Sequence, residues 1–439
     1  MELALHILFT LAAAVLCLAV LKKWRFVRSS GIRFKTVKWV FGLKIVAGMV
    51  LWAIYTYHYS YRNTSDAFRY FDDALVLYQT LKTEPQIYFR FLFGVNLQEA
   101  DLVPTFEKLR GWSSSYSYGI ANDNPTIIRL NMVIALFSQG FYHVHTVVFC
   151  FLSTIGLIAF IRGCYAIGQI LVHKTVAFIS VALLPTIWFW GSGVLKEAPL
   201  IAGIGALLWS YSQVIQRKWK FLFGMALALF VLAFLKPYVL VAMLPALIAL
   251  SLSRFIKVKP YVRYLGVLIL SYTAAVNAGA FYEPGNFLYI LQKKQTDFYN
   301  VAALNEAGST IAISPVDQSP VGFLTQIPER ITTAFMRPFP WEVNGLFYAP
   351  PMLESVFLLF LMLLVGFKFR SKGRELMANE LFCFALSFVV VLGVIIGSAV
   401  PVLGAVVRYR LPGLMFASML IPLVLYLYPN FNRRVANLF

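Results

Sequence analysis

The sequence predicts an all-α integral membrane protein with about eleven transmembrane helices and two long extracytoplasmic loops that carry amphipathic interfacial helices. Three observations support this prediction. Of the 439 residues, 60% are hydrophobic and 13% are charged, whereas soluble domains average about 45–50% apolar and about 25% charged residues. Several apolar stretches reach the roughly 20 residues that a helix needs to cross a hydrocarbon core about 30 Å thick. Short basic runs separate these stretches.

The apolar stretches define a single polytopic transmembrane domain, residues 1–439. The first stretch has no basic residues before it, and its lysines and arginines follow the apolar run, so we interpret it as a retained span and not as a signal peptide. The candidate spans lie at about 3–21, 39–58, 141–161, 175–192, 198–215, 220–235, 238–253, 264–281, 353–367, 380–400 and 411–428.

Positive charge predicts the orientation of the spans. The formal net charge of +19 would favour a nucleic-acid partner in a soluble protein, but here the basic residues gather between spans. Placing the 22–38 connection in the cytoplasm collects more than half of the 38 lysines and arginines on that side, with only Glu375 and Glu380 among the acids. Cytoplasmic loops show this bias. We therefore expect a multi-pass protein of the cell membrane (inner or plasma membrane), with an extracytoplasmic N-terminus, a cytoplasmic C-terminus and no nucleic-acid partner.

The cysteines and histidines predict no disulfide framework and no zinc site. All four cysteines lie inside or at the ends of apolar stretches, where disulfides are not expected. His143 and His145 share a short motif, and the other three histidines are scattered. This spacing is not that of zinc ligands, so we interpret the histidines as interface or core residues.

The two long outer loops, 59–140 and 282–352, carry most of the acidic residues. The first contains the helical pattern SDAFRYFDDALVLYQTLK, with Ser65 as the expected N-cap. Its later part, NPTIIRLNMVIALFSQGF, is amphipathic and is expected to lie along the membrane surface. The second loop ends in the proline-rich, aromatic sequence RPFPWEVNGLFYAPPMLE, which is typical of an interfacial lid.

The first candidate site is acidic. Asp66, Tyr70 and Asp73 are spaced i, i+4 and i+7, which places them on one face of a helix, and Asp72 is adjacent to Asp73. Carboxylates at the mouth of a membrane cavity can act as a general base toward an acceptor hydroxyl or hold a divalent cation such as Mg²⁺ or Mn²⁺. The alternative is a solvated helix face whose first turn is stabilised by Asp66.

The second candidate site interrupts a long apolar stretch. In PTIWFWGSGVLKEAPLIAG, the polar residues Ser192, Lys196 and Glu197 stand at the outer end of the fourth and fifth spans. Ionisable groups so close to the bilayer are costly unless they meet a partner or a ligand. Lys196 is a candidate for a lipid phosphate, and Glu197 for its counter-ion or for substrate hydroxyls. The alternative is a hairpin tip with a lysine that extends to the surface.

Two further groups lie at the outer ends of later spans. Arg408 and Arg410, in VVRYRLPGLMF, could grip a phosphate, because guanidinium groups bind phosphate oxygens bidentately. In ITTAFMRPFPWEVN, Arg337 accompanies Trp341 and Glu342. A tryptophan next to a carboxylate can bind a sugar by covering its apolar face. The alternatives are a basic flank near lipid headgroups and an ordinary interfacial tryptophan.

Taken together, these motifs resemble the GT-C superfamily of polytopic glycosyltransferases, which includes the dolichyl-phosphate-mannose and lipid A aminoarabinose transferases. The matching features are the acidic outer loop SDAFRYFDDA, the outer turn FWGSGVLKEA and RYRLP before the final span. FWGSGVLKEA is also similar to the FWSSGxxKD stretch of bacterial membrane proteins of polysaccharide assembly, and RPFPWE followed by Glu354 fits the same set.

The resemblance implies inverting transfer of a sugar from a polyprenyl-phosphate donor to a glycan, lipid or protein acceptor on the outer face. It implies Asp66 at the acidic catalytic position, with Asp72 or Asp73 assisting. By the same resemblance, Lys196, Arg408 and Arg410 would neutralise the departing lipid phosphate.

Three other functions remain open at this point. A polysaccharide polymerase of the O-antigen or exopolysaccharide type would use similar arginines on long outer loops. A transporter or flippase of lipid-linked sugars would show pseudo-repeats and broken helices that meet at the midplane. A non-catalytic scaffold of a surface-assembly complex would not require charged residues in a cavity.

Overall fold

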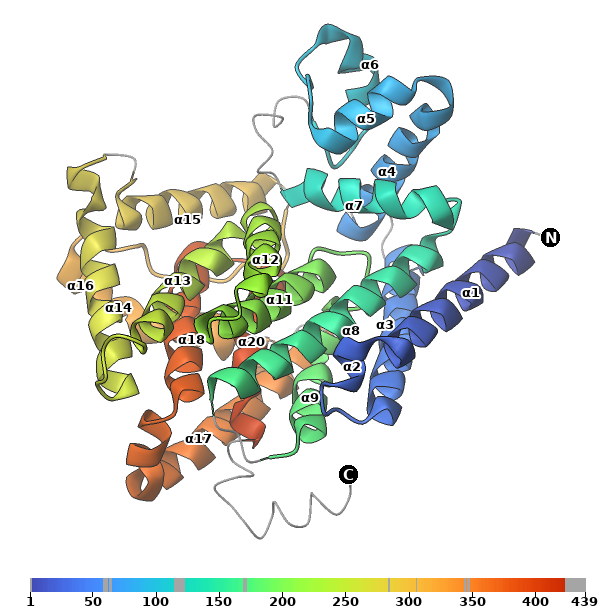
Figure 1. Ribbon diagram of the computed structural model, residues 1–439. Helices are drawn as coiled ribbons and strands as arrows, with labels where there is room; N and C mark the ends of the chain where they lie inside the picture. The colour runs from blue at the N-terminus through green and yellow to red at the C-terminus, as the bar shows by residue number, and fades with distance from the viewer. Residues whose placement is uncertain are drawn as a thin grey trace. The chain divides into compact units, whose positions relative to one another are not determined.

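A computed structural model describes residues 2–57, 62, 65–113, 123–168, 172–282, 285–304, 306–342, 345 and 348–422 (Figure 1). Regular structure in these ranges is helical, apart from an isolated antiparallel bridge between Thr310 and Val402. The chain divides into two compact units. Unit 1 comprises Met1–Gly163 and Trp188–Pro237, and unit 2 comprises Cys164–Ile187 and Tyr238–Phe439.

Unit 1 contains the N-terminal helices and the described part of the 59–140 segment, for which an outer location stays a prediction, and the ends of α8 and α10 extend into unit 2. Its helices are α1 (Glu2–Lys23), α2 (Arg25–Arg28), α3 (Phe34–Tyr57), α4 (Asp66–Thr83), α5 (Pro85–Phe93), η2 (Ala100–Leu102), α6 (Val103–Phe106), α7 (Asp123–Ser138), α8 (Tyr142–Ile167), α10 (Pro185–Trp190), α11 (Glu197–Ile215), η4 (Trp219–Phe221) and α12 (Leu222–Leu235).

Unit 2 contains the described part of the 282–352 segment, for which an outer location likewise stays a prediction, and the C-terminal helices. Its helices are α9 (Lys174–Ala182), α13 (Pro237–Leu252), α14 (Pro260–Asn277), η5 (Ala278–Ala280), α15 (Phe287–Leu304), α16 (Pro320–Phe335), η7 (Pro340–Glu342), α17 (Ala349–Met377), α18 (Glu380–Ala399), α19 (Leu403–Tyr409) and α20 (Leu411–Ala417).

Six helices of the described residues are long and apolar enough to cross a membrane, namely α1, α3, α8, α11, α17 and α18. Three shorter apolar helices lie at Trp219–Leu235, Pro237–Leu252 and Leu411–Pro422. The stretch predicted as one span at 175–192 is instead two short helices, α9 and α10. Pro185 explains the break, because proline lacks the backbone N–H and restricts the residue before it. The end of the stretch predicted at 411–428 lies outside the described residues.

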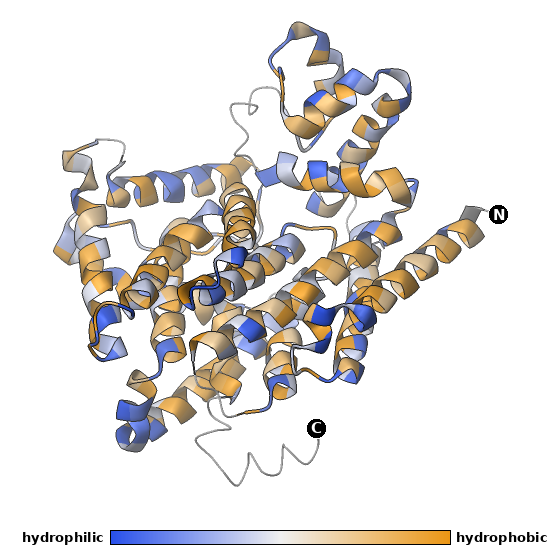
Figure 2. Ribbon diagram, in the orientation of Figure 1, coloured by the Kyte–Doolittle hydropathy of each residue, from blue (hydrophilic) through white to orange (hydrophobic). Residues whose placement is uncertain are grey.

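Helix α1 exposes most of its apolar surface. Only 6% of its most apolar window is buried, and Leu3, Leu8 and Leu11 are each more than half exposed. Figure 2 shows α1 and α8 as hydrophobic along most of their length. An apolar surface of this extent fits contact with lipid and not with water.

The helices α8 and α11 pack at very short distance in unit 1. A Cβ on Gly156 would lie 2.5 Å from the Ala202 Cα, and a Cβ on Gly205 would lie 2.0 Å from the Gly156 carbonyl oxygen. Membrane helices use small residues in this way to bring their backbones together. The same contact holds α11, whose first residue Glu197 belongs to the second candidate site, against α8.

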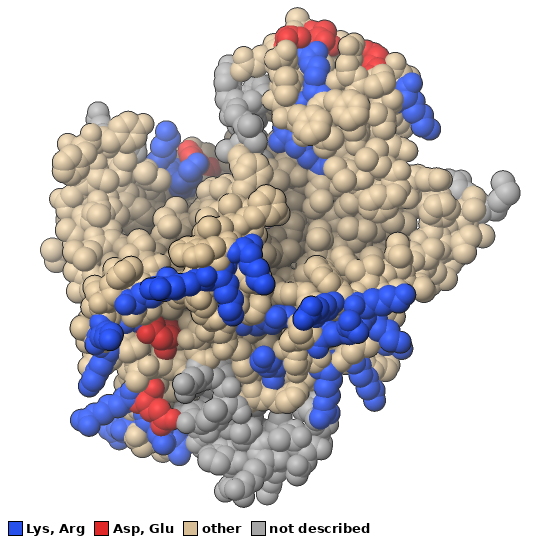
Figure 3. All heavy atoms as spheres, viewed as in Figure 1, with Lys and Arg blue, Asp and Glu red and all other residues tan. Residues whose placement is uncertain are grey.

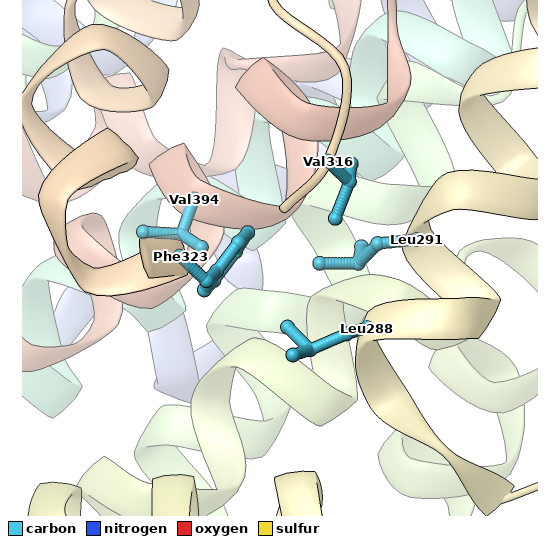
Figure 4. Packing of buried hydrophobic residues seen from close by; sticks show 5 residues of the cluster. All are labelled: Leu288, Leu291, Val316, Phe323 and Val394. Atoms are coloured by element: carbon cyan, nitrogen blue, oxygen red, sulfur yellow. The ribbon is translucent and has the colours of Figure 1, made fainter. Parts of the chain in front are cut away.

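Unit 2 has a hydrophobic cluster that joins α15, α16 and α18. Its buried members are Leu288, Leu291, Val316, Phe323 and Val394 (Figure 4). Burial of such side chains is the main source of stability in a helical core. The cluster therefore fixes the second outer loop on the apolar helix α18.

Charge differs between the two ends of unit 1. On the face shown in Figure 3, the end around α2 carries Lys and Arg side chains alone, whereas the lobe formed by α4, α5 and α6 carries Asp and Glu together with Lys and Arg. At the basic end, Arg162 of α8 lies over the rings of Phe26 and Trp209, at 4.4 and 4.3 Å from their centroids. Which end of unit 1 faces the cytoplasm stays a prediction from the positions of the basic residues.

Candidate functional site

The predicted acidic helix is α4. Ser65 is its N-cap residue with extended backbone angles, although its side chain makes no capping hydrogen bond. Tyr70 and Asp73 are both buried, and Asp66 in the first turn is half-buried. Asp72 points elsewhere and forms an exposed ion pair with Arg62, at 2.7 Å. The four residues predicted at this site therefore have different environments.

Asp73 supports a turn of the first outer loop. Its two carboxylate oxygens accept the backbone N–H groups of Arg110 and Gly111, at 2.9 and 2.8 Å. A Cβ on Gly111 would lie 3.2 Å from the Asp73 carboxylate, so a larger residue would crowd this contact. Burial raises the pKa of Asp73, and the backbone hydrogen bonds oppose that rise. Both oxygens are in use, and we therefore give Asp73 a structural role.

We expect Asp73→Asn to reduce stability by about 1–3 kcal/mol, because its amide nitrogen would meet a backbone N–H donor and leave that donor unsatisfied. The measurement is the free energy of unfolding in detergent. Asp72→Asn is the matched control, since it changes an exposed pair and should cost at most about 1 kcal/mol. Equal effects of the two substitutions would contradict the role given to Asp73.

Lys196 is the centre of the second predicted site, and the structure connects it to the acidic loop. Its ammonium lies 2.6 Å from the Asp123 Oδ2 atom and donates to the Asn124 Oδ1 atom at 2.6 Å. Tyr70 also donates to Asn124 Oδ1, at 3.1 Å, and its ring centroid lies 5.3 Å from the lysine nitrogen. Asn124 in turn donates to the Gly111 carbonyl, at 3.1 Å. The lysine is therefore held in one position by residues of α4 and α7.

Other charges lie around the Lys196 ammonium. Burial lowers the pKa of Lys196, Asp123 and Asp66 raise it by attraction, and Lys236 lowers it further by repulsion. Lys196 also precedes the N-terminus of α11, where the helix dipole is positive. A second cation and a helix N-terminus close to Lys196 favour binding of an anion at this position.

A buried polar network fixes the second half of α7. The His145 ring nitrogens lie 2.7 Å from the Asn131 Oδ1 atom and 2.8 Å from the Ser138 Oγ atom. All three side chains are fully buried. A buried and satisfied network of this kind makes the packing specific. It holds α7, which carries Asp123 and Asn124, against α8.

Asp123, Asn124 and Lys236 are site residues that the sequence reading did not identify. Lys236 had a usable signal, because it stands alone between two apolar helices, as Lys196 does. Asp123 and Asn124 had none, since they lie in an ordinary polar segment more than 70 positions from Lys196. Glu197, which was identified, is buried in the first turn of α11.

Arg410 is buried in unit 2, where its guanidinium contacts other protein groups. Its side chain and that of Glu354 are both fully buried and form an ion pair at 3.1 Å. It also donates to the Arg337 and Pro351 carbonyls, at 2.5 and 3.0 Å. Glu354 accepts from the backbone N–H and the hydroxyl of Thr186, at 3.0 and 2.5 Å. These contacts are with protein groups, and we therefore assign Arg410 to the support of unit 2.

We expect Glu354→Leu to reduce stability by about 3–5 kcal/mol, because it leaves the buried Arg410 guanidinium without its counter-ion. Chemical unfolding in detergent measures this loss. Glu375→Leu is the control, since the Glu375–Lys372 pair is exposed and should contribute at most about 0.5 kcal/mol. Removing both Glu354 and Arg410 should cost less than the sum of the single changes; additive costs would mean that the two side chains do not interact.

The remaining predicted residues also lie in unit 2. Arg337 pairs with Glu342 at 3.4 Å, and Trp341 is exposed and stacks on Phe339 with ring centroids 4.8 Å apart. Arg408 is half-buried in the last turn of α19. The convergence of Asp66, Lys196 and Arg410 on one cavity therefore stays a prediction: the first two lie together in unit 1, whereas Arg410 belongs to unit 2.

A search of the described residues finds no group of three or more His, Cys, Asp or Glu side chains arranged to hold a metal ion. Comparison with protein-family models, curated proteins and solved structures finds no match for this chain. The fold is all-helical, with several helices long and apolar enough for a multi-pass membrane protein. The function must therefore be argued from the site.

Proposed function

We propose that this protein is a membrane glycosyltransferase of the GT-C type. It would transfer a sugar from a polyprenyl-phosphate donor to an acceptor on the extracytoplasmic face, in assembly or modification of a cell-surface glycan. The observation that carries this proposal is the Lys196 cluster. A buried ammonium is held by Asp123 and Asn124, with Asp66 and Lys236 in its electrostatic range, at the start of an apolar helix.

The cluster contains both groups that such a transfer requires. The acceptor hydroxyl attacks the anomeric carbon, the bond from that carbon to the phosphate oxygen breaks, and the phosphate leaves with the electron pair. Lys196 and Lys236 would neutralise the negative charge that develops on the phosphate, which lowers the barrier directly. Asp66 would accept the proton of the acceptor hydroxyl.

Asp123 gives Lys196 an anionic partner that a phosphate can replace. The lysine is nine-tenths buried or more, and a buried cation needs a counter-ion. A donor phosphate would take over the place of Asp123 and release its carboxylate next to the acceptor.

The membrane arrangement is part of the proposal. Eleven spans, an extracytoplasmic N-terminus and a cytoplasmic C-terminus would place α4, α7 and the start of α11 at the outer surface. There the polyprenyl tail of the donor remains in lipid while its sugar and the acceptor remain in water. Glu197, Arg337, Trp341, Glu342 and Arg408 stay candidates for contact with substrate.

The test is to incubate purified protein with a panel of polyprenyl-phosphate sugars and acceptor glycans and to measure released polyprenyl phosphate and extended acceptor. We expect both products in equal amounts. Each donor is assayed both with and without EDTA. Products only from polyprenyl-diphosphate oligosaccharides would indicate a polymerase instead. Movement of the donor across vesicle membranes without release of lipid phosphate would indicate a flippase. Either result would overturn the proposal.

A further inference from the structure

The segment between α10 and α11 is buried although it is not helical. Every residue from 191 to 196 is buried, and none of them is in a helix. The sequence predicted a polar site at the outer ends of two spans here, with a hairpin tip as the alternative. The segment lies beside α3 and α8, two of the helices long enough to cross a membrane.

A break in a helix leaves backbone carbonyls without their usual donors. In an apolar environment these carbonyls must find partners in the surrounding protein. Two side chains supply such donors. The Lys44 ammonium donates to the Gly191 carbonyl at 3.3 Å, and the Cys150 thiol donates to the Ser192 carbonyl at 3.3 Å.

The shape of α3 also fits the segment. A Cβ on Gly48 would lie 2.4 Å from the Ser192 carbonyl oxygen, and a Cβ on Gly193 would lie 2.2 Å from the Leu51 Cδ2 atom. A side chain at Gly48 would displace the backbone of the segment, and one at Gly193 would displace the Leu51 side chain. One face of α3 carries Lys44, Gly48 and Leu51 in succession. These three residues contact residues 191, 192 and 193 of the segment in the same order.

Lys44 itself is unusual in its location. It lies near the middle of α3 and is fully buried. A lysine in such a place is costly, and lysines there commonly serve function or pair with backbone carbonyls.

We propose that Lys44 is a positioning residue for the Lys196 site: through the Gly191 carbonyl it holds the 191–196 segment in place, so that Lys196 at the end of the segment meets Asp123 and Asn124. The consequence for catalysis rests on the proposed function, whereas the positioning itself can be measured without it. Lys44 does not touch substrate in this proposal. It acts only through the backbone that carries Lys196.

The test compares Lys44→Met with the parent by acetylating the protein in detergent and measuring modification of Lys196 by mass spectrometry. Lys82 and Lys108, which are exposed on the same unit, serve as internal references. Lys44→Met removes one hydrogen bond and should raise modification of Lys196 relative to these references about tenfold. Val46→Met is the matched control, because Val46 is 54% exposed on the same helix and should change nothing.

The pH dependence of the acetylation separates positioning from a general loosening of the fold. In the parent, the Lys196 ammonium is surrounded by Asp123, Asp66 and Lys236. When the segment is released, Lys196 becomes hydrated, so the midpoint of its modification should move to higher pH. A fold that is merely loosened would also make the fully buried Cys164 of α8 reactive toward a thiol reagent, and that outcome would overturn the proposal.

Modification of Lys196 at the parent's rate and midpoint in folded Lys44→Met would also overturn it. If that variant does not fold, Lys44→Gln replaces it, because the glutamine side chain is polar but shorter than lysine. The rate and the pH midpoint of Lys196 modification are then measured in the same way. A shift in Lys196 modification with no transferase activity in any variant would support the positioning role and reject the proposed function. A shift accompanied by a lower rate of transfer would support both.

Discussion

Lys196→Met should lower the rate of sugar transfer by about 100- to 1,000-fold, the loss typical for removal of one group that stabilises developing charge. Methionine has nearly the length of lysine but carries no charge, so the departing phosphate would lose its closest cation. Because this contact strengthens as the phosphate leaves, kcat should fall more than KM rises. The measurement is the steady-state release of polyprenyl phosphate. The control is Lys108→Met, an exposed lysine of the same unit.

The pH dependence of the transfer rate is a second test of Lys196. Burial and Lys236 lower the pKa of Lys196 below that of an ordinary lysine. Activity that requires the ammonium should therefore be complete at lower pH and should fall as the pH rises through this lowered pKa. The alkaline limb should disappear in Lys196→Met. A rate and an alkaline limb that are the same in variant and parent would remove Lys196 from the mechanism.

Asp66→Asn should lower the rate of transfer by about 100- to 10,000-fold, the range that a general base contributes. The amide keeps the size of the carboxylate but cannot accept the proton of the acceptor hydroxyl. Binding of the donor should change little, because its phosphate is held by cations. Turnover with saturating donor and acceptor measures the chemical step, and the affinity for donor is measured separately.

Asp72→Asn is the matched control for Asp66→Asn. It lies on the same helix, but its carboxylate is exposed and paired with Arg62, so turnover should stay within about twofold of the parent. Asp123→Asn tests the other carboxylate near Lys196. If Asp66→Asn retains full activity, the assignment of Asp66 as the base is wrong.

The apolar stretches correctly predicted helices, but they did not predict where a stretch is divided into two helices. The stretch at 175–192 contains Pro185, and proline predicts an interruption, yet apolar composition alone gave a single span. The structure divides the stretch into α9 and α10. Hydropathy measures how apolar a stretch is, and it does not detect where a helix ends and resumes inside the protein.

Arginines show a second limit of the sequence. Arg408 and Arg410 stand two positions apart near a predicted membrane surface, and both could bind phosphate by residue type. The structure leaves Arg408 half-buried and pairs the fully buried Arg410 with Glu354. Glu354 is 56 positions away in the chain. No local pattern reports a counter-ion at that distance.

The sequence by itself determined the helical class, the apolar helices and the separation of basic from acidic connections. These properties depend on composition and on the lengths of local runs, which can be read directly. The tertiary structure decided which polar residues meet. It joined Lys196 to Asp123, Asn124 and Tyr70, and it buried the 191–196 segment against Lys44, because both contacts depend on how helices distant in sequence pack against each other.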